Sequence, residues 1–552
     1  MTRTTAPADL VLRNARIHTV DPRLPAAEAL AVRDGRIVWV GPDAEAAAWT
    51  GEDTRLIDGA GRLVLPGFID AHNHVRLGSD DACVQLAGAR TLTEIHHRIT
   101  AWSADHPDAE WIEAEAFDYS AIPDGRMPNA ADLDTVTGDI PAFVLSYDVH
   151  TAWLNTAALR RLGVTKETTS LPFGRAETDP VTGEPTGFIK DFAVKGLSRD
   201  GHRALRELGV PWAAPDRQYG RLVKSLDDAI RFGITTVVEP QNSLDDLELF
   251  TRARAEGRLR SRLVAALFHP RGTTDADLDD FAATAARFDD DRMRVGPLKL
   301  YIDDVVEPRT AALLEPYTGC GKHRGDTFYP PEEFAGLLTK LDARGFQCFV
   351  HATGDRGIRT VLDAVEHAIE VNGARDARHQ VVHVECLDPQ DTARFAELGV
   401  VACMQPRHCA PEIAGPGQDW AENVGSDRWH KAWPMRSLHE AGAVLAFSSD
   451  WNVAEMDPMI GIYTAVTRRP LGGGEPWQPG ETVDVETAVH GYTMGSAHAN
   501  FLEGERGSLS VGKLADFTVL SRDILRISPE DIPGTTAELV VVGGEVVAGT
   551  GA

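Results

Sequence analysis

Short, nearly continuous apolar runs alternate with longer amphipathic stretches through most of the chain. This alternation is typical of successive strand–helix units, and stretches such as residues 330–345 and 357–373 have the length and spacing of helices. Eight such units predict an α/β fold, a (β/α)8 TIM barrel whose active site lies at the carboxyl ends of its strands. The predicted strands are residues 63–72, 233–240, 261–270, 295–303, 346–354, 379–385, 399–406 and 442–450.

Both ends of the chain have a different pattern, with short alternating runs and hairpin-type turns such as Arg33-Asp34-Gly35 and Asp58-Gly59. Two β-rich ends can pair when the termini of the domain between them lie close together. We therefore expect residues 1–66 and 503–552 to form one small β-sandwich domain around a barrel of residues 67–502. The long segment between the first two barrel strands, about residues 77–218, predicts an inserted subdomain over the barrel mouth.

Composition narrows the possible partners. The 552 residues carry a net charge of -28, which disfavours nucleic acid and anionic membrane surfaces. The first twenty residues contain no apolar signal-peptide core, and no run of 18 apolar residues occurs, so we expect no membrane span and a cytoplasmic protein. Six scattered cysteines without C-x-x-C spacing indicate reduced, packing thiols rather than a zinc ribbon.

Polar side chains stand at or near the carboxyl ends of five predicted barrel strands. Taken singly, each has an ordinary explanation: a hydrogen-bonded core histidine, an ion-paired lysine or a helix-capping aspartate. Imidazole and carboxylate groups gathered at one end of a barrel instead suit Zn²⁺ or a similar divalent ion with an open position for water. The predicted set is His72, His74, Lys299, His351, His383 and Asp450.

The order of several motifs resembles the metal-dependent amidohydrolase superfamily over nearly the whole chain. Within it, the chain is most similar to amidohydrolase family 3, of the YtcJ-like or N-substituted formamide deformylase type. The motifs are PGFIDAHNH, LKLYID followed by RTAALLEPY, HATGD, RHQVVHVE, MQPRH and FSSDWNV, with DVHTAWLNTAAL and GEPTGF in the insertion and GSLSVGKLADFTVL near the end.

The resemblance implies that His72, His74 and Asp450 bind one metal ion and that His351 and His383 bind a second. Lys299 matches a lysine that is carboxylated in binuclear members and bridges the two ions. A single ion with an unmodified lysine is the alternative. Some positions depart from the family pattern, among them Val382, Asp304 and Asn452, and these bear on the substrate more than on the reaction class.

The implied reaction is hydrolysis of an amide C–N bond, in an N-formyl, N-acyl or cyclic amide, by water activated on the metal. Asp450 would transfer the proton from water to the leaving nitrogen. A deaminase or decarboxylase on the same barrel and a non-catalytic scaffold are the alternatives, and the resemblance makes a homodimer plausible. Residues predicted to contact the small-molecule substrate or the oxyanion are Asp148, His150, Trp153, Asn155, Arg309, Gln405 and His408.

Overall fold

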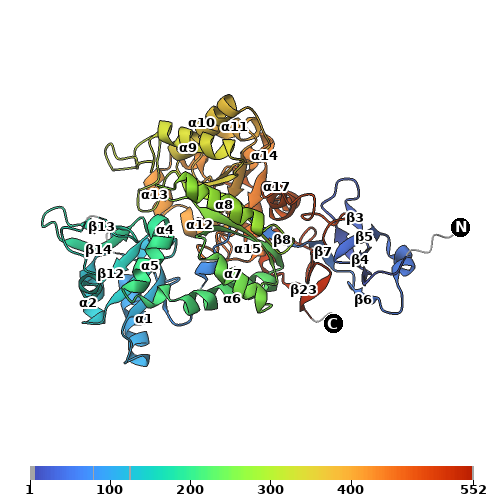
Figure 1. Ribbon diagram of the computed structural model, residues 1–552, viewed down its shortest axis with the longest axis horizontal. Helices are drawn as coiled ribbons and strands as arrows, with labels where there is room; N and C mark the ends of the chain where they lie inside the picture. Colours follow the sequence, from blue (N-terminus) through green and yellow to red (C-terminus); the bar gives the residue numbers. More distant parts are fainter. Residues whose placement is uncertain (1–5, 79, 123–125, 169, 550–552) are drawn as a thin grey trace.

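Eight parallel strands form the central sheet of the protein (Figure 1). The structure is a computed structural model that describes residues 6–549 except 79, 123–125 and 169. Hydrogen bonds from Ala71 N to Phe447 O and from Asp450 N to His72 O join the last strand to the first. Each predicted run overlaps one strand of this sheet, and the first run also contains a strand of the sandwich, which confirms the TIM-barrel fold class. The strands are β8 (Phe68–Asp70), β15 (Ile234–Asn242), β16 (Arg262–Phe268), β17 (Met293–Tyr301), β18 (Cys348–Ala352), β19 (Gln380–His383), β20 (Val401–Met404) and β21 (Leu445–Phe447).

Helices connect these strands and cover the outside of the barrel (Figure 1). In α10, for example, Ile358, Val361, Leu362 and Val365 are buried on one face, as the amphipathic pattern predicts. The barrel helices are α6 (Pro215–Arg231), α7 (Leu247–Ala255), α8 (Asp275–Arg287), α9 (Pro331–Ala343), α10 (Asp355–Asn372), α11 (Thr392–Glu397), α14 (Met435–Glu440), α15 (Pro458–Thr467), α16 (Val485–His490) and α17 (Ser496–Ala499).

Alternation along each strand separates two apolar layers. In β18, Cys348 and Val350 belong to the large core between the strands and the helices, whereas Phe349 belongs to a second cluster with residues of the other strands. Ala497 and Leu502, from the segment after β21, complete that second cluster. The barrel interior is therefore packed at one end, and polar side chains occupy the other.

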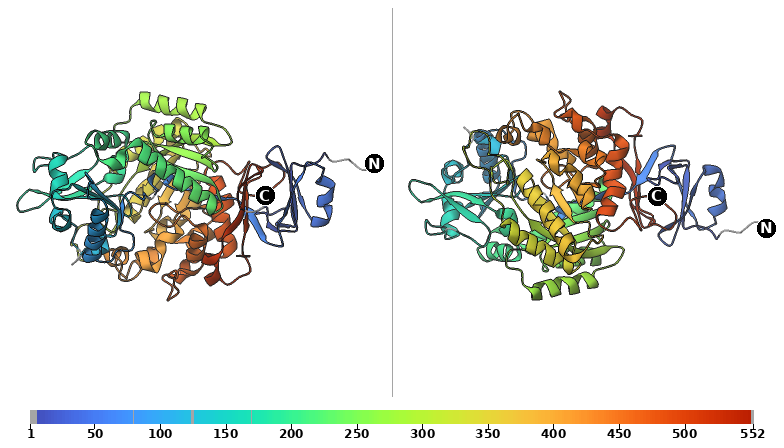
Figure 2. Two further views of the ribbon diagram at one scale, coloured as in Figure 1. Left: turned by 90° about the horizontal axis from the view of Figure 1, so that it is seen from below. Right: turned by 90° about the horizontal axis from the view of Figure 1, so that it is seen from above.

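The two ends of the chain form a β-sandwich at the opposite end of the molecule from the insertion (Figure 2). One sheet has the order β5-β4-β1-β6 and the other β24-β23-β22-β7-β2-β3, so strands from both termini share the second sheet. A single apolar cluster, including Leu12, Val32, Val64, Phe517 and Val541, lies between the sheets. The strands are β1 (Leu10–Arg13), β2 (Arg16–His18), β3 (Ala26–Ala27), β4 (Ala29–Arg33), β5 (Arg36–Gly41), β6 (Arg55–Asp58), β7 (Leu63–Pro66), β22 (Phe517–Leu520), β23 (Ala537–Val542) and β24 (Glu545–Gly549).

Gly67 lies where the chain passes from β7 of the sandwich to β8 of the barrel. A Cβ atom at this position would stand 2.2 Å from the side chain of Thr235, so only glycine allows the backbone to approach β15 this closely. The exact domain boundaries given above stay predictions.

The segment between β8 and α6 forms a separate six-stranded sheet of order β13-β14-β12-β11-β10-β9 (Figure 1). It has two apolar clusters of its own, which explains why it stands as a subdomain. Its strands are β9 (Val84–Gln85), β10 (Ile112–Phe117), β11 (Ala142–Ser146), β12 (Ala152–Leu154), β13 (Arg175–Thr178) and β14 (Pro185–Lys190). Its helices are α1 (Leu92–Asp105), α2 (Ala130–Thr137), α3 (Thr156–Arg161), α4 (Phe192–Lys195) and α5 (Arg199–Glu207).

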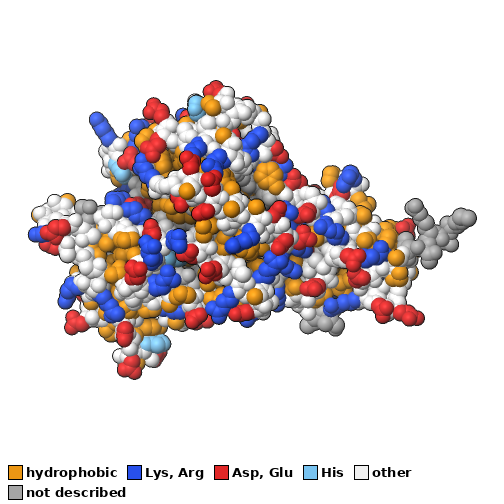
Figure 3. All heavy atoms as spheres, viewed as in Figure 1, with side chains coloured by type: hydrophobic (Ala, Val, Ile, Leu, Met, Phe, Trp, Pro, Cys, Tyr) orange, Lys and Arg blue, Asp and Glu red, His pale blue; other side chains and the backbone are white. Residues whose placement is uncertain are grey.

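Acidic and basic side chains are interspersed on the face of the molecule seen in Figure 3, so the net charge of -28 is not gathered in one patch of that face. Within the part of the chain that the structure describes, no helix is long and apolar enough to cross a membrane.

A buried ion pair connects the barrel to the sandwich. Arg262 of β16 donates from Nε and Nη2 to the two carboxylate oxygens of Asp516, at 2.7 and 2.9 Å, and both residues are almost fully buried. We expect Arg262→Met to lower the free energy of unfolding by about 3–5 kcal/mol, because Asp516 is left as a buried charge without its main partner. Chemical unfolding followed by circular dichroism measures the change.

Two comparisons separate this effect from the loss of any arginine. Arg271→Met breaks an exposed pair with Glu333 and should cost no more than about 1 kcal/mol. The double variant Arg262→Met/Asp516→Leu should recover much of the lost stability, because the unpaired charge is gone. Equal losses in the two single variants would show that the buried pair has no special role.

Candidate metal centre and active site

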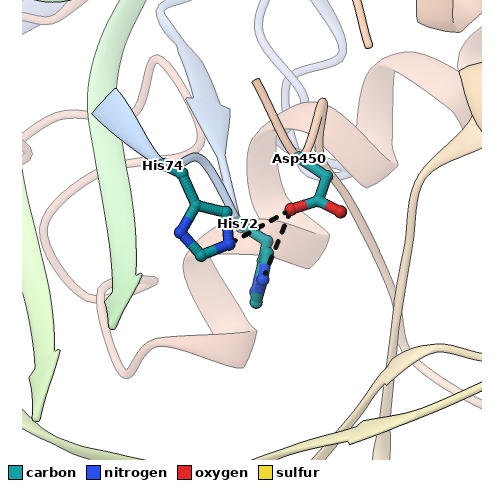
Figure 4. Close-up of side chains that lie close together, drawn as sticks. All are labelled: His72, His74 and Asp450. Carbon is teal, nitrogen blue, oxygen red and sulfur yellow. Dashed lines mark ion pairs between the residues drawn. The ribbon is translucent and has the colours of Figure 1, made fainter. Parts of the chain in front are cut away.

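His72, His74 and Asp450 converge at the mouth of the barrel (Figure 4). Nε2 of His72 and Nε2 of His74 lie 3.7 and 3.4 Å from Oδ1 of Asp450. The predicted strand of residues 63–72 is too long at its carboxyl end, because β8 ends at Asp70 and both histidines lie in the loop that follows. Their common direction comes from backbone hydrogen bonds of His74 N to Trp451 O and of Asp450 N to His72 O.

These three side chains fit a divalent metal ion. Ligands bound to a tetrahedral zinc ion at about 2.1 Å lie about 3.4 Å from one another, close to the separations seen here. Oδ1 of Asp450 is buried and has no hydrogen-bond partner within the described part of the chain. A buried carboxylate oxygen without a hydrogen-bond partner, beside two imidazole nitrogens, fits a bound cation, and the mixed nitrogen and oxygen donors suit zinc.

Asp70 holds the loop with the histidines against the loop with Asp450. Its carboxylate accepts hydrogen bonds from Ser449 N at 2.9 Å, from Ser449 Oγ at 2.6 Å and from Asn73 Nδ2 at 2.9 Å. Burial raises the pKa of Asp70 to about 6, so the group is still mainly charged at neutral pH and remains a strong acceptor. The sequence analysis missed Asp70, although a carboxylate two residues before His72 was a visible signal.

A second group of donors shares Asp450 and consists of His383, His408 and Asp450. His383 Nδ1 donates to Gln405 Oε1 at 2.8 Å, and Gln405 Nε2 donates to Ser448 Oγ at 2.9 Å. The second nitrogen of His383 is thereby left with its lone pair. Gln405 is fully buried behind His383 and therefore orients this candidate metal ligand. The predicted contact of Gln405 with substrate is not what the structure shows.

His383 faces the site because its backbone departs from the strand pattern. In β19, Val381 packs outward and Val382 inward, so regular alternation would direct residue 383 outward. A φ of +84° at His383, followed by +51° at Val384, breaks this alternation at the strand end. Sequence periodicity alone cannot reveal such a change.

Lys299 and His351 complete the cluster of predicted residues. Lys299 Nζ lies 3.3 Å from His72 Nε2, and the rings of His351 and His383 are 4.4 Å apart. Burial lowers the pKa of Lys299 to about 8 and holds the pKa values of His72, His351 and His383 well below their usual value. The imidazoles are therefore neutral at pH 7, the form that binds metals.

The insertion contributes His150 to the same cluster. Its Nδ1 makes a short hydrogen bond to Asp304 Oδ1, and its ring centroid lies 5.3 Å from that of His351. Burial disfavours the charged imidazole, but the carboxylate of Asp304 outweighs this effect and raises the pKa of His150 to about 9. Neighbouring Asp148 is buried and accepts from Tyr119 Oη and His150 N. The sequence analysis did not identify Asp304 as the partner of His150.

Two connected cavities lead to these residues between the insertion and the barrel. The inner chamber contains residues of the cluster, and the outer chamber has a volume of about 330 Å³. The two share Tyr147, Glu307, Ile413, Val453 and Ala454 as lining residues, so they are adjacent. The other residues around the inner chamber are Asp148, His150, Val305, His351, Thr353, His383, Glu385, His408, Trp433 and Asp450.

A profile described as "Amidohydrolase family" matches residues 55–548 of the chain. The chain belongs to this family. The family comprises metal-dependent hydrolases, and this member is an enzyme that acts on carbon–nitrogen bonds other than peptide bonds. The resemblance inferred from the motifs is thereby confirmed.

Three curated relatives match this amidohydrolase over almost its whole length. Protein LONG AFTER FAR-RED 3 of Arabidopsis thaliana is 29% identical over 98% of this chain and 91% of its own. N-substituted formamide deformylase of Arthrobacter pascens is 29% identical over 93% and 94%, and putative amidohydrolase YtcJ of Bacillus subtilis is 26% identical over 94% and 96%. An uncharacterized metal-dependent hydrolase from Pyrococcus horikoshii has the same fold, with a TM-score of 0.71, 23% identity and coverage of 94% of this chain and 99% of its own.

Three of the predicted substrate contacts lie elsewhere in the amidohydrolase, which corrects those predictions. Trp153 is fully buried in a core of the insertion, where its Nε1 donates to Asn129 O. Asn155 caps α3 by accepting from Ala158 N, and Arg309 is exposed beside a surface cleft, with Nε donating to Asn423. None of the three residues lines either chamber. Their polar groups have local structural partners instead.

Proposed function

We propose that this amidohydrolase is zinc-dependent and hydrolyses the C–N bond of a small N-formyl, N-acyl or cyclic amide. The observation that carries the proposal is the convergence of His72 Nε2, His74 Nε2 and the unpartnered Asp450 Oδ1 at separations suited to one ion. The likeness to N-substituted formamide deformylase supports a formamide as the first substrate to test.

A bound divalent ion would supply Lewis-acid activation of the amide carbonyl and of water. Asp450 would accept a proton from water and deliver it to the leaving nitrogen, without which an amine leaves poorly. The position of Oδ2 supports this role, since it lies 3.7 Å from His383 Nδ1 and 4.0 Å from His408 Nε2, and all three residues line the inner chamber. His150, held by Asp304, would donate a hydrogen bond to the carbonyl oxygen as negative charge develops there.

A second ion would use His383 and the remaining donors. The family resemblance favours His351 with a carboxylated Lys299, and the low pKa of Lys299, caused by burial, favours the neutral amine that carboxylation requires. The geometry adds His408 as a further donor, because His383, His408 and Asp450 form a compact group.

Metal analysis of the purified protein, combined with an amide panel, tests this function. We expect zinc in the protein and release of formate or another carboxylic acid from at least one N-substituted formamide, N-acyl amine or cyclic amide. Two zinc ions per chain support a bridging Lys299, and one supports the mononuclear site. Full turnover by metal-free protein, or release of ammonia or CO₂ as the primary product, would contradict the proposal.

Asp70→Asn tests the residue that holds the two loops together. The amide cannot accept hydrogen bonds from Ser449 as the carboxylate does, so we expect zinc affinity and kcat each to fall by about 10–100-fold. Zinc affinity is measured by competition with a chelator, and circular dichroism verifies the fold. Unchanged zinc affinity would mean that Asp70 has only a structural role.

A further inference from the structure

Two carboxylates in the inner chamber have no role in the proposed reaction. Glu307, in the loop after β17, lies where the inner and outer chambers meet. Glu385, two residues after β19, lines the inner chamber and is 6% exposed. Both line the inner chamber, whose wall also contains Asp450.

Among the described residues, neither carboxylate forms an ion pair with a lysine or an arginine. Within the described part of the chain, no lysine or arginine lies within 4.0 Å of Glu307 or Glu385. Glu385 Oε2 accepts from Trp420 Nε1 at 3.0 Å, while its Oε1 is 4.0 Å from His408 Nδ1. Burial, together with the nearby Glu385, raises the pKa of Glu307 well above its usual value, so that a bound cation would be needed to favour its ionised form. Glu385 is buried and Glu307 is partly buried, and a bound cation would supply the opposite charge that both carboxylates can use.

The arginines of the outer chamber do not supply positive charge to Glu307 and Glu385, because acidic residues of the same chamber already neutralise them. Arg90 pairs with Asp118, and Arg407 pairs with both Glu412 and Glu455. The route to the inner chamber therefore has an excess of negative charge, and this charge favours the entry of cations.

Aromatic side chains around the inner chamber add to this preference. Tyr147 and Trp433 line it, and their ring faces attract ammonium and guanidinium groups. Trp433 is 1% exposed, yet its Nε1 has no hydrogen-bond partner among the described residues. This N–H could donate to an acceptor such as the amide oxygen of a bound substrate, whereas the ring face is the part that would attract a cation.

We propose that the substrate carries a protonated amine or guanidinium group, which binds between Glu307 and Glu385 while its amide lies at Asp450. This proposal rests on the proposed function and specifies its substrate class. The ring of His408 lies between the carboxylates of Glu385 and Asp450, with Nδ1 and Nε2 each 4.0 Å from one of them. The cationic group must therefore be separated from the amide by a short chain.

Matched pairs of amides test the proposal. Each pair contains an ω-aminoalkyl formamide and its neutral isostere, such as N-(5-aminopentyl)formamide and N-hexylformamide, in a series that lengthens one methylene at a time. We expect at least one ammonium member to have a kcat/KM about tenfold or more above that of its isostere, as expected for a close charge pair. Formate release measures turnover.

Variants that remove one carboxylate charge but keep the shape of the side chain identify the residues responsible for the preference for ammonium substrates. Glu307→Gln and Glu385→Gln should each reduce it to about threefold or less, because the attraction to the cation is lost. Glu207→Gln, at an exposed residue of α5, should keep the full preference. Thermal unfolding of all three variants verifies that they fold.

Calorimetric binding to Asp450→Asn protein separates the two proposals, since it requires no turnover. Tighter binding of the ammonium member without formate release by the wild-type enzyme would refute the amide reaction and leave the cation site intact. Equal binding within every pair, binding of no member, or an unchanged preference in Glu307→Gln and Glu385→Gln would overturn the cation site.

Discussion

Asp450→Asn should reduce turnover by about 10³-fold or more while the protein stays folded. Asparagine keeps the size of the side chain and its place after β21, but it cannot take the proton from water or carry a negative charge toward the ion. Oδ1 and Oδ2 of Asp450 face different groups of histidines, so this one substitution affects both proposed roles. Steady-state formate release at saturating zinc measures the loss.

A matched control separates this effect from the general loss of an acid. Asp326→Asn removes a fully exposed carboxylate and should keep wild-type turnover. Thermal unfolding of Asp450→Asn should stay near that of the wild type, because replacing one buried carboxylate by an amide relieves part of the charge burial. Substantial activity in Asp450→Asn would remove this residue from the proposed mechanism.

His72→Ala should weaken zinc binding by more than about 100-fold, and turnover should fall with it. Loss of a direct ligand is expected to exceed the effect of losing a side chain that only supports a ligand. His72 is fully buried and its Nε2 faces both Asp450 Oδ1 and Lys299 Nζ, so no neighbouring histidine replaces it without a change of backbone. Zinc competition with a chelator gives the affinity, and activity after zinc addition gives the functional loss.

The control for this experiment is His367→Ala, which removes an exposed histidine of α10. It should bind zinc as the wild type does. If His72→Ala also retains wild-type zinc content and turnover, the ion does not bind at His72, His74 and Asp450. Chelation of the wild-type protein should abolish activity, and added zinc should restore it.

Several structural expectations failed for physical reasons that belong to the tertiary fold. The first barrel strand was expected to reach His72, but it ends at Asp70, and the loop after it is positioned by contacts with residues near Asp450. Trp153 and Asn155 were expected at the substrate because of their motif, yet one fills a core and the other caps a helix. A motif gives the residue types in order, but it does not distinguish residues that stabilise the fold from residues that contact substrate.

The sequence by itself determined the succession of the elements. Eight apolar runs separated by amphipathic stretches specify parallel strands and covering helices, since each must bury its apolar face against the next. The β-rich ends and the polar residues near the strand ends were equally visible, because they depend on local composition and on the order of elements along the chain.

Only the tertiary structure decided how the site is assembled. Asp70 is near His72 in sequence but acts through Ser449, and Asp304 meets His150 across 154 positions of the chain. The inward direction of His383 depends on a left-handed backbone conformation at the end of β19. That Glu307 and Glu385 lie among described residues without a lysine or arginine in ion-pair distance follows from which side chains surround them. Contacts between distant segments, and the set of charged groups around a side chain, are established only when the chain folds. Periodicity and motifs therefore do not reveal them.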